Sequence, residues 1–196
     1  MGCNRLGFAL EHTHLQPQEA TLLYALVHAA RPQFVFEVGS FQGGSARIIA
    51  EALIDAGQPS TRSSFFMIDP EPRLVPLHAS FLDDKATIIA APSPAAYRQL
   101  PRITPGFDFA FIDGDHAEAA VLADLSAARP LLAPGAIVLC HDAAYAPTRR
   151  GIDRAVLEGG FVDCGDLVGN PVWTDQFENG ERVLWGGLRM LRRAGA

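Results

Sequence analysis

The chain has 196 residues, of which 48% are hydrophobic and 19% are charged, and its formal net charge is −6. This composition is typical of a soluble globular protein, and the length predicts a single domain, 1–196, that begins with an N-terminal arm, 1–16. The negative charge argues against nucleic acid as a partner, because broad nucleic-acid binding needs a basic face, and no apolar run is long enough to predict a membrane partner.

There is no C-x-x-C pair, and Cys140 and Cys164 lie in apolar runs. We therefore expect buried free thiols and a cytoplasmic protein.

Predicted helices and strands alternate along most of the chain. Pro17 begins the first helix at the position where proline costs least, and apolar residues continue at helical spacing until Pro32. Further helices are expected from Ser45 to Gly57, within 71–84, at 95–100, after His116 and at 148–158. Strands are expected at 34–38, 65–69, 87–91, 107–113, 136–140, 161–164 and 182–191, with Pro134-Gly135 as a turn before the fifth and Asn179-Gly180 as a tight turn before the last.

This alternation predicts an α/β fold with a Rossmann-like, doubly wound, seven-stranded sheet that is mostly parallel. The connection between the last two expected strands is too short for a crossover helix. We therefore expect these two strands to form an antiparallel hairpin at the C-terminal edge of the sheet.

A glycine-rich turn joins the first expected strand to the next helix. Residues 34–45 read FVFEVGSFQGGS, so the glycines follow a G-x-x-x-G-G spacing rather than the G-x-G-x-x-G of a dinucleotide site. Glu37 precedes the first glycine, Gly39, by two positions, and its carboxylate would repel a phosphate but attract an ammonium group. The turn therefore favours a ligand with an amino-acid end, such as S-adenosylmethionine. The alternative is a glycine turn in an unrelated α/β protein.

Acidic and histidine side chains recur where the expected strands end. Asp69 ends the second strand, where a carboxylate can accept hydrogen bonds from both hydroxyls of a ribose; the alternative is a turn residue before Pro70. Asp113 and Asp142 follow neighbouring strands, which lie ~4.8 Å apart in a parallel sheet, so both carboxylates could reach one divalent ion. The complete set is Glu37, Asp69, Ser93, Asp113, Asp115, His116, His141 and Asp142.

On these residues the chain resembles the class I S-adenosylmethionine-dependent methyltransferases from about Pro17 to Ala143. The resemblance is to the branch that contains the metal-dependent catechol and caffeoyl-coenzyme A O-methyltransferases and the macrolide-sugar O-methyltransferases. It implies that Asp69 binds the ribose of the cofactor and that Ser93 lies near the adenine. It also implies that Asp113 and Asp142 bind a metal, and because two carboxylates suit hard cations we expect Mg²⁺ as this second cofactor. The other residues that it places around S-adenosylmethionine are Glu37, Gly39, Ser40, Phe41, Gly43, Ser45 and Asp113.

Two positions depart from the pattern of that branch. Its base is a lysine three residues after the first metal-binding aspartate, and here this position is His116, which can serve as a base with an ordinary pKa of ~6.5. The alternative for His116 is an exposed residue at the start of a helix. The third metal ligand of the branch is an asparagine, and here it is Ala143, which leaves the presence of a metal open. Asp115 or His141 could replace that ligand, although the alternation of side chains along a strand predicts that His141 points to the opposite face from its neighbours.

We therefore expect an enzyme that transfers a methyl group from S-adenosylmethionine to a hydroxyl of a small-molecule acceptor, with His116 and Asp113 as catalytic residues. One alternative is an NAD-dependent oxidoreductase, which Glu37 and the glycine spacing disfavour. The other is a catalytically silent cofactor-binding module, which the cluster of acids and histidines disfavours. Because the sequence shows no large insertion that could act as a lid, we expect either the N-terminal arm or the second subunit of a homodimer to close the site.

Overall fold

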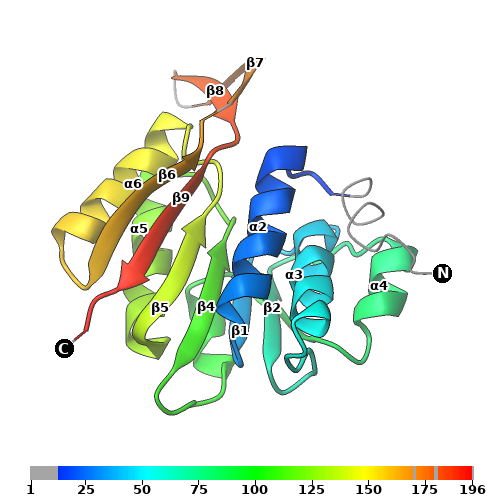
Figure 1. Ribbon diagram of the computed structural model, residues 1–196. Coiled ribbons are helices and arrows are strands. Elements are labelled where there is room, and N and C mark those ends of the chain that lie inside the picture. Colours follow the sequence, from blue (N-terminus) through cyan, green and yellow to red (C-terminus); the bar gives the residue numbers. More distant parts are fainter. Residues whose placement is uncertain (1–12, 170, 179–180, 196) are drawn as a thin grey trace. The chain divides into compact units, whose positions relative to one another are not determined.

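The computed structural model describes residues 13–169, 171–178 and 181–195, and the chain divides into two compact units, Met1–Leu100 and Pro101–Ala196 (Figure 1). Most of the predicted N-terminal arm lies outside the described residues, and the single domain 1–196 stays a prediction. Among the described residues, no helix combines the length and the apolar character that crossing a membrane requires.

The first unit is built around three parallel strands in the order β3-β2-β1. Every residue of β1 and β2 is buried, which explains why their sequences are almost continuously apolar. Helices α2 and α3 pack against each other, and α4 packs against α3 (Figure 1). The elements are α2 (Pro17–Ala30), β1 (Val35–Val38), α3 (Gly44–Asp55), β2 (Phe65–Asp69), α4 (Pro76–Leu82), β3 (Thr87–Ala90) and the 3₁₀ helix η1 (Ala95–Gln99).

Helix α2 begins at Pro17, as predicted. The Glu19 carboxylate accepts a hydrogen bond from the backbone N–H of Gln16 (2.9 Å), which satisfies one donor at the start of the helix. The helix ends at Ala30, and the capping residue Arg31 has a left-handed φ of 52° and donates its N–H to the Val27 carbonyl. The chain then turns directly into β1, which carries the glycine-rich turn at its carboxyl end.

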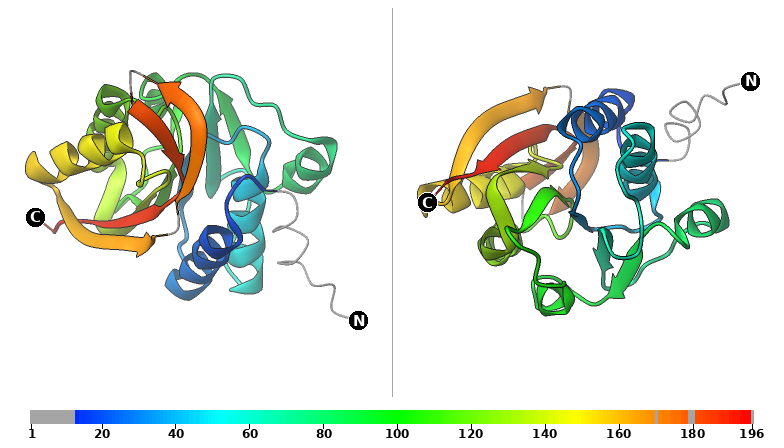
Figure 2. Two further views of the ribbon diagram at one scale, coloured as in Figure 1. Left: turned by 90° about the horizontal axis from the view of Figure 1, so that it is seen from above. Right: turned by 60° about the horizontal axis from the view of Figure 1, so that its bottom comes forward.

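The second unit contains four strands in the order β4-β5-β9-β6. Strands β4 and β5 are parallel, whereas β9 runs antiparallel to both β5 and β6, so the predicted antiparallel pairing of the last strands is confirmed. Helices α5 and α6 pack side by side on one face of these strands (Figures 1 and 2). The elements are β4 (Phe107–Ile112), α5 (Glu118–Ala128), the 3₁₀ helix η2 (Arg129–Leu131), β5 (Leu132–Cys140), α6 (Ala146–Leu157), β6 (Phe161–Val168) and β9 (Leu188–Arg193).

The single strand expected at 182–191 is wrong. The structure divides it into β8 (Glu181–Trp185) and β9, because Gly186 and Gly187 have φ values of 96° and 91° and break the extended backbone. Strand β8 pairs with β7 (Val172–Glu178) in a separate two-stranded sheet, here called the β7–β8 arm, which extends beyond the carboxyl ends of β5 and β6 (Figure 1). The tight turn expected at Asn179-Gly180 lies outside the described residues.

Two smaller expectations are also corrected in the second unit. Pro134 and Gly135 lie inside β5 rather than in a turn before it, where the register between β4 and β5 shifts. Cys140 is buried as expected, and burial raises its pKa to about 12. Cys164 is exposed instead, because β6 is an edge strand whose pairing with β9 is interrupted next to this residue.

Candidate functional site

The first candidate site is the turn between β1 and α3, which is held by the carboxylate at the end of β2. The Gly39 N–H donates to the Ile68 carbonyl (2.8 Å), and the Phe41 N–H donates to Asp69 Oδ2 (2.8 Å). Asp69 Oδ1 accepts a second backbone hydrogen bond from Glu71 (2.7 Å). Each carboxylate oxygen has a further lone pair, so Asp69 can order this turn and still accept a hydrogen bond from a ligand hydroxyl.

The structure explains why glycine is required at position 43. Gly43 precedes α3 with a φ of 87°, and a Cβ atom there would lie 3.1 Å from the Cβ of His78 and 2.7 Å from a methyl group of Leu74. His78 is itself fixed, because its Nδ1 lies 2.9 Å from the Gln42 carbonyl oxygen. Helix α4 and the segment before it therefore pack directly on the turn and set its shape.

The residues that the sequence assigned to the cofactor lie at or just after the carboxyl ends of the strands of the first unit or, for Ser45, in the first turn of α3, with one exception. Glu37, Ser40, Ser45 and Asp69 are buried, whereas the Phe41 ring is 44% exposed and has a left-handed φ of 40°. Ser93 is half-buried and follows β3. The exception is Asp113, which belongs to the second unit. The cofactor contacts of all these residues stay predictions.

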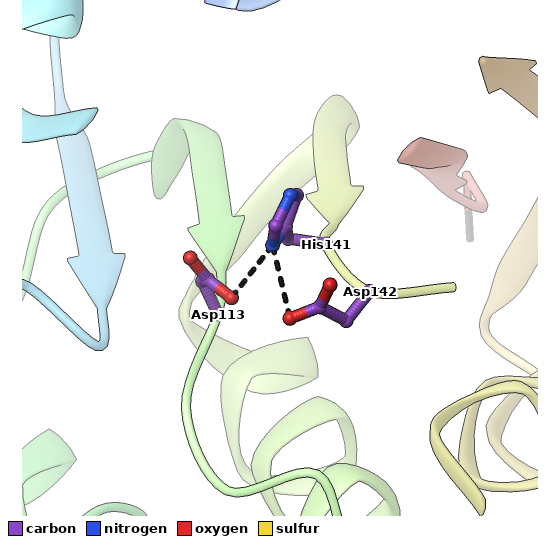
Figure 3. A group of neighbouring side chains, drawn as sticks. All are labelled: Asp113, His141 and Asp142. Atoms are coloured by element: carbon purple, nitrogen blue, oxygen red, sulfur yellow. Dashed lines mark hydrogen bonds and ion pairs between the residues drawn. The ribbon is translucent and has the colours of Figure 1, made fainter. Parts of the chain in front are cut away.

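The second candidate site is a cluster of two carboxylates and two imidazoles in the second unit. Ile112 of β4 pairs with Cys140 of β5, so the residues that follow each strand lie side by side. The Nδ1 atom of His141 is 3.0 Å from Asp113 Oδ1 and 3.3 Å from Asp142 Oδ2 (Figure 3). The parallel pairing thus brings Asp113 and Asp142 together, as the sequence predicted.

The expected orientation of His141 is wrong. Its ring lies between the two carboxylates rather than on the opposite face (Figure 3). The alternation rule fails because β5 ends at Cys140, and Asp142 has a left-handed φ of 50° that turns the backbone. His141 therefore supplies the third donor atom that Ala143 lacks, and the donor atoms of Asp113, His141 and Asp142 lie within 4.8 Å of one another.

His116 approaches the same carboxylates from the turn before α5. Its Nε2 is 3.0 Å from Asp142 Oδ2 and 4.0 Å from Asp113 Oδ1. Asp115 does not join this cluster, because its Oδ1 accepts a hydrogen bond from the Ala117 N–H (2.8 Å) and shapes the turn instead. His116 is thus the residue of this turn that can exchange a proton beside the cluster.

The two carboxylates have different electrostatic environments. Burial raises the pKa of Asp113, although the neighbouring His141 opposes this effect. Burial also acts on Asp142, but His116, His141 and the Gly186 N–H outweigh it and bring the Asp142 pKa well below its usual range. For His116, burial favours the neutral ring, yet the nearby Asp142 and Asp113 outweigh it and raise the pKa of His116.

The base of the β7–β8 arm contacts this cluster, which the sequence reasoning missed. The Trp185 ring meets the His116 ring edge to face, with centroids 4.8 Å apart, and the Gly186 N–H donates to Asp142 Oδ1. The signal that could have revealed this contact is the pair Gly186-Gly187, because two glycines inside an expected strand mark a break or a close approach of two backbones.

Comparisons with known proteins give one match to a family and several to individual proteins. A family model described as a methyltransferase domain matches residues 36–143. Rhamnosyl O-methyltransferase from Mycobacterium tuberculosis is 33% identical over 119 residues, which cover 57% of this chain and 46% of that protein. Its counterpart from Mycobacterium leprae is 33% identical over 118 residues, covering 57% and 48%. The chain therefore spans about half the length of the curated relatives it matches.

Several solved structures share the fold over almost the whole chain. An O-methyltransferase from Bacillus cereus in complex with S-adenosylhomocysteine has a TM-score of 0.66 at 16% identity, covering 98% of this chain and 92% of that one. A putative O-methyltransferase from Klebsiella pneumoniae has a TM-score of 0.69 at 16% identity, covering 100% and 92%. The O-methyltransferase TomG from Streptomyces achromogenes, in complex with S-adenosylmethionine, has a TM-score of 0.66 at 17% identity, covering 100% and 92%. These likenesses confirm the predicted Rossmann-like, seven-stranded α/β fold.

Proposed function

The chain belongs to the methyltransferase domain family, and from this premise we propose that it transfers a methyl group from S-adenosylmethionine to a hydroxyl of a small molecule. The observation that carries the choice of a hydroxyl is the pairing of His116 with Asp142, whose Nε2 and Oδ2 atoms are 3.0 Å apart. A hydroxyl must lose a proton as it is methylated, and this pair offers a base with an orienting carboxylate.

The proposal assigns cofactor binding to the first unit. The buried Glu37 carboxylate is suited to an ammonium group, and Asp69 has lone pairs left for a ribose hydroxyl after it has accepted two backbone hydrogen bonds. The turn begins and ends with glycine, and at Gly43 the packing of Leu74 and His78 leaves no room for a side chain. These features favour S-adenosylmethionine over a dinucleotide, whose pyrophosphate a buried carboxylate would repel.

The reaction is an in-line displacement at the methyl carbon of the sulfonium. The acceptor oxygen forms a bond to this carbon while the bond from carbon to sulfur breaks, so S-adenosylhomocysteine leaves as a neutral thioether. His116 Nε2 faces Asp142, which leaves Nδ1 of the same ring to accept the hydroxyl proton. Asp142 orients the ring and stabilises the imidazolium that forms, because its low pKa keeps it ionised. Alignment of the two reactants can itself lower such a barrier by ~7–11 kcal/mol.

Asp113, His141 and Asp142 form a donor set that fits a divalent cation, because two carboxylates and one imidazole nitrogen converge there. The two carboxylates favour Mg²⁺ or Mn²⁺. A cation bound to these residues would lower the pKa of a neighbouring hydroxyl. Because Asp142 belongs to this set and also faces His116, a bound cation would favour the neutral form of His116, so cation binding and the role of His116 as the base would be coupled.

The acceptor that we propose is a sugar hydroxyl. The support comes from the curated relatives, which carry the name rhamnosyl O-methyltransferase and share 33% identity with residues of this chain. Because the chain spans about half of their length, the acceptor of this chain must be tested directly, with rhamnosides compared against catechols.

Titration calorimetry tests the cofactor assignment. We expect S-adenosylmethionine and S-adenosylhomocysteine to bind and NADH not to bind. Asp69→Ala should weaken binding of both sulfur compounds by about 1.5–3 kcal/mol, the scale of a hydrogen bond to a charged group. Asp55→Ala, at an exposed carboxylate bonded to Tyr24, is the matched control and should bind like the wild type. Tight NADH binding without binding of either sulfur compound would refute the proposal.

Removal of cations tests the donor set separately. After treatment with EDTA we expect turnover to fall and to recover when Mg²⁺ or Mn²⁺ is added. Asp113→Asn should weaken the recovery, since it removes one carboxylate donor. Unchanged turnover after thorough EDTA treatment would mean that the aspartates serve to orient the two imidazoles and hold no metal.

A further inference from the structure

Two consecutive residues at the base of the β7–β8 arm hold the two members of the proposed base pair. The Trp185 side chain packs edge to face against the His116 ring, with 4.8 Å between centroids and an angle of 61° between planes. The next residue, Gly186, donates its N–H to Asp142 Oδ1, while Asp142 Oδ2 faces His116. The indole and the carboxylate therefore contact the same imidazole, and one short segment fixes both.

This segment is itself firmly placed. The Ala144 N–H donates to the Gly186 carbonyl (3.0 Å), and the Ala143 N–H donates to the Gly187 carbonyl (3.2 Å). Val183 and Leu188, which flank the segment, are fully buried. The Trp185 ring also packs against the buried ring of Tyr145, with centroids 5.9 Å apart. These contacts hold the Trp185 ring in place, so that it is a fixed surface against which the His116 ring packs.

His116 lies in the turn before α5 and its side chain is 29% exposed, so packing against Trp185 limits the rotation of its ring. An imidazole that rotates away from Asp142 loses the orientation that this carboxylate gives it, because the 3.0 Å approach of Nε2 to Oδ2 is lost. We propose that Trp185 is a positioning residue that holds the His116 ring against Asp142 in the productive orientation. This inference rests on the proposed function, and it makes the β7–β8 arm, through its base, a part of the catalytic apparatus.

Two substitutions of Trp185 and one control test the proposal. Trp185→Leu removes the ring, and we expect kcat to fall by about 10- to 100-fold, the scale of a misplaced catalytic group, while the acceptor KM and the S-adenosylmethionine Kd stay within about twofold. Trp185→Phe keeps an aromatic contact and should restore most of kcat. Phe177→Leu changes an exposed aromatic residue on β7 of the same arm and should behave like the wild type. A loss confined to the acceptor KM would overturn the proposal, since it would mean that Trp185 contacts the acceptor instead.

A double-mutant cycle separates positioning from general support of the fold. If Trp185 acts through His116, Trp185→Leu should cause no further loss of kcat in a His116→Ala background. An equal loss in both backgrounds would show that Trp185 serves the structure at large, and the proposal would fail.

A measurement without turnover keeps this inference distinct from the proposed function. The ring-proton chemical shifts of His116, assigned by comparison with His116→Ala, should change in Trp185→Leu, because the ring current of the indole is lost. Those of His28 should not change. If the wild type transfers no methyl group but these shifts move, the proposed function fails while the contact stands. If the shifts of His116 do not move, the positioning role is contradicted whatever the activity.

Discussion

His116 and His141 contact the same two carboxylates, yet the surroundings make these carboxylates unequal. Burial raises the pKa of Asp113, whereas two imidazoles and the Gly186 N–H lower that of Asp142. Asp142 is therefore the stable anion of the cluster, and it is also the carboxylate nearer to His116. Strand ends in the sequence could predict that the carboxylates meet, but not this asymmetry, because it depends on how His116 and His141 lie around Asp142 and on the N–H of a glycine 44 positions along the chain.

The pH dependence of turnover follows from this asymmetry. His116 accepts a proton only when it is neutral, and its raised pKa predicts that turnover rises with pH through an ionisation above the ordinary imidazole range. Asp142→Asn removes the negative charge that raises the His116 pKa against the effect of burial. The His116 pKa should therefore fall, and the increase of turnover with pH should occur at lower pH. The measurement is kcat against pH at saturating cofactor and acceptor.

Asp115→Asn is the control for this prediction, because its side chain bonds to its own turn and an asparagine can keep that hydrogen bond. Its profile should match that of the wild type. A profile for Asp142→Asn that stays in place or moves to higher pH would contradict the assignment of His116 as the base.

At the scale of elements, the sequence predicts best where one pattern dominates. The nearly continuous apolar runs of β1, β2 and β4 placed these strands within a residue or two of their observed bounds. The β7–β8 arm was not predicted, because apolar residues flank Gly186-Gly187 on both sides. In the sequence β8 and β9 therefore have the pattern of one strand. The break depends on a backbone contact with Ala143 and Ala144, which a local pattern cannot encode.

The close approach at Gly187 gives a prediction about stability. Gly187 and Gly165 have nearly equal φ values of 91° and 89°, so alanine strains the backbone similarly at both. A Cβ at Gly187 would lie 2.9 Å from the Ala144 backbone nitrogen, whereas a Cβ at Gly165 would meet nothing within 4 Å. We expect Gly187→Ala to lower the free energy of unfolding by about 1–2 kcal/mol more than Gly165→Ala does, and to lower kcat as well. Denaturant titration of both variants measures the difference, and equal values would contradict the tight packing of this segment.

At the scale of the whole molecule, the residues proposed for the two tasks belong to two compact units. The turn and the carboxylate proposed for the cofactor lie within Met1–Leu100, and the cluster proposed for proton transfer lies within Pro101–Ala196. The family match ends at residue 143, so it includes Asp69, His116 and Asp142 but not the β7–β8 arm. This explains why the sequence could predict the candidate residues of both units, while the contact of Trp185 with His116 needed the structure.

The most direct test of the account is methyl transfer from labelled S-adenosylmethionine to a rhamnoside, measured for the wild type and for His116→Ala together with cofactor affinity. The wild type should transfer the label to a hydroxyl oxygen of the sugar. His116→Ala should lower kcat by ~10²–10⁴-fold, the usual cost of losing a general base, with the cofactor Kd nearly unchanged. A variant with wild-type kcat would remove His116 from the mechanism and direct attention to His141. A variant that also loses cofactor binding would contradict the account, because His116 would then support the structure rather than the chemistry.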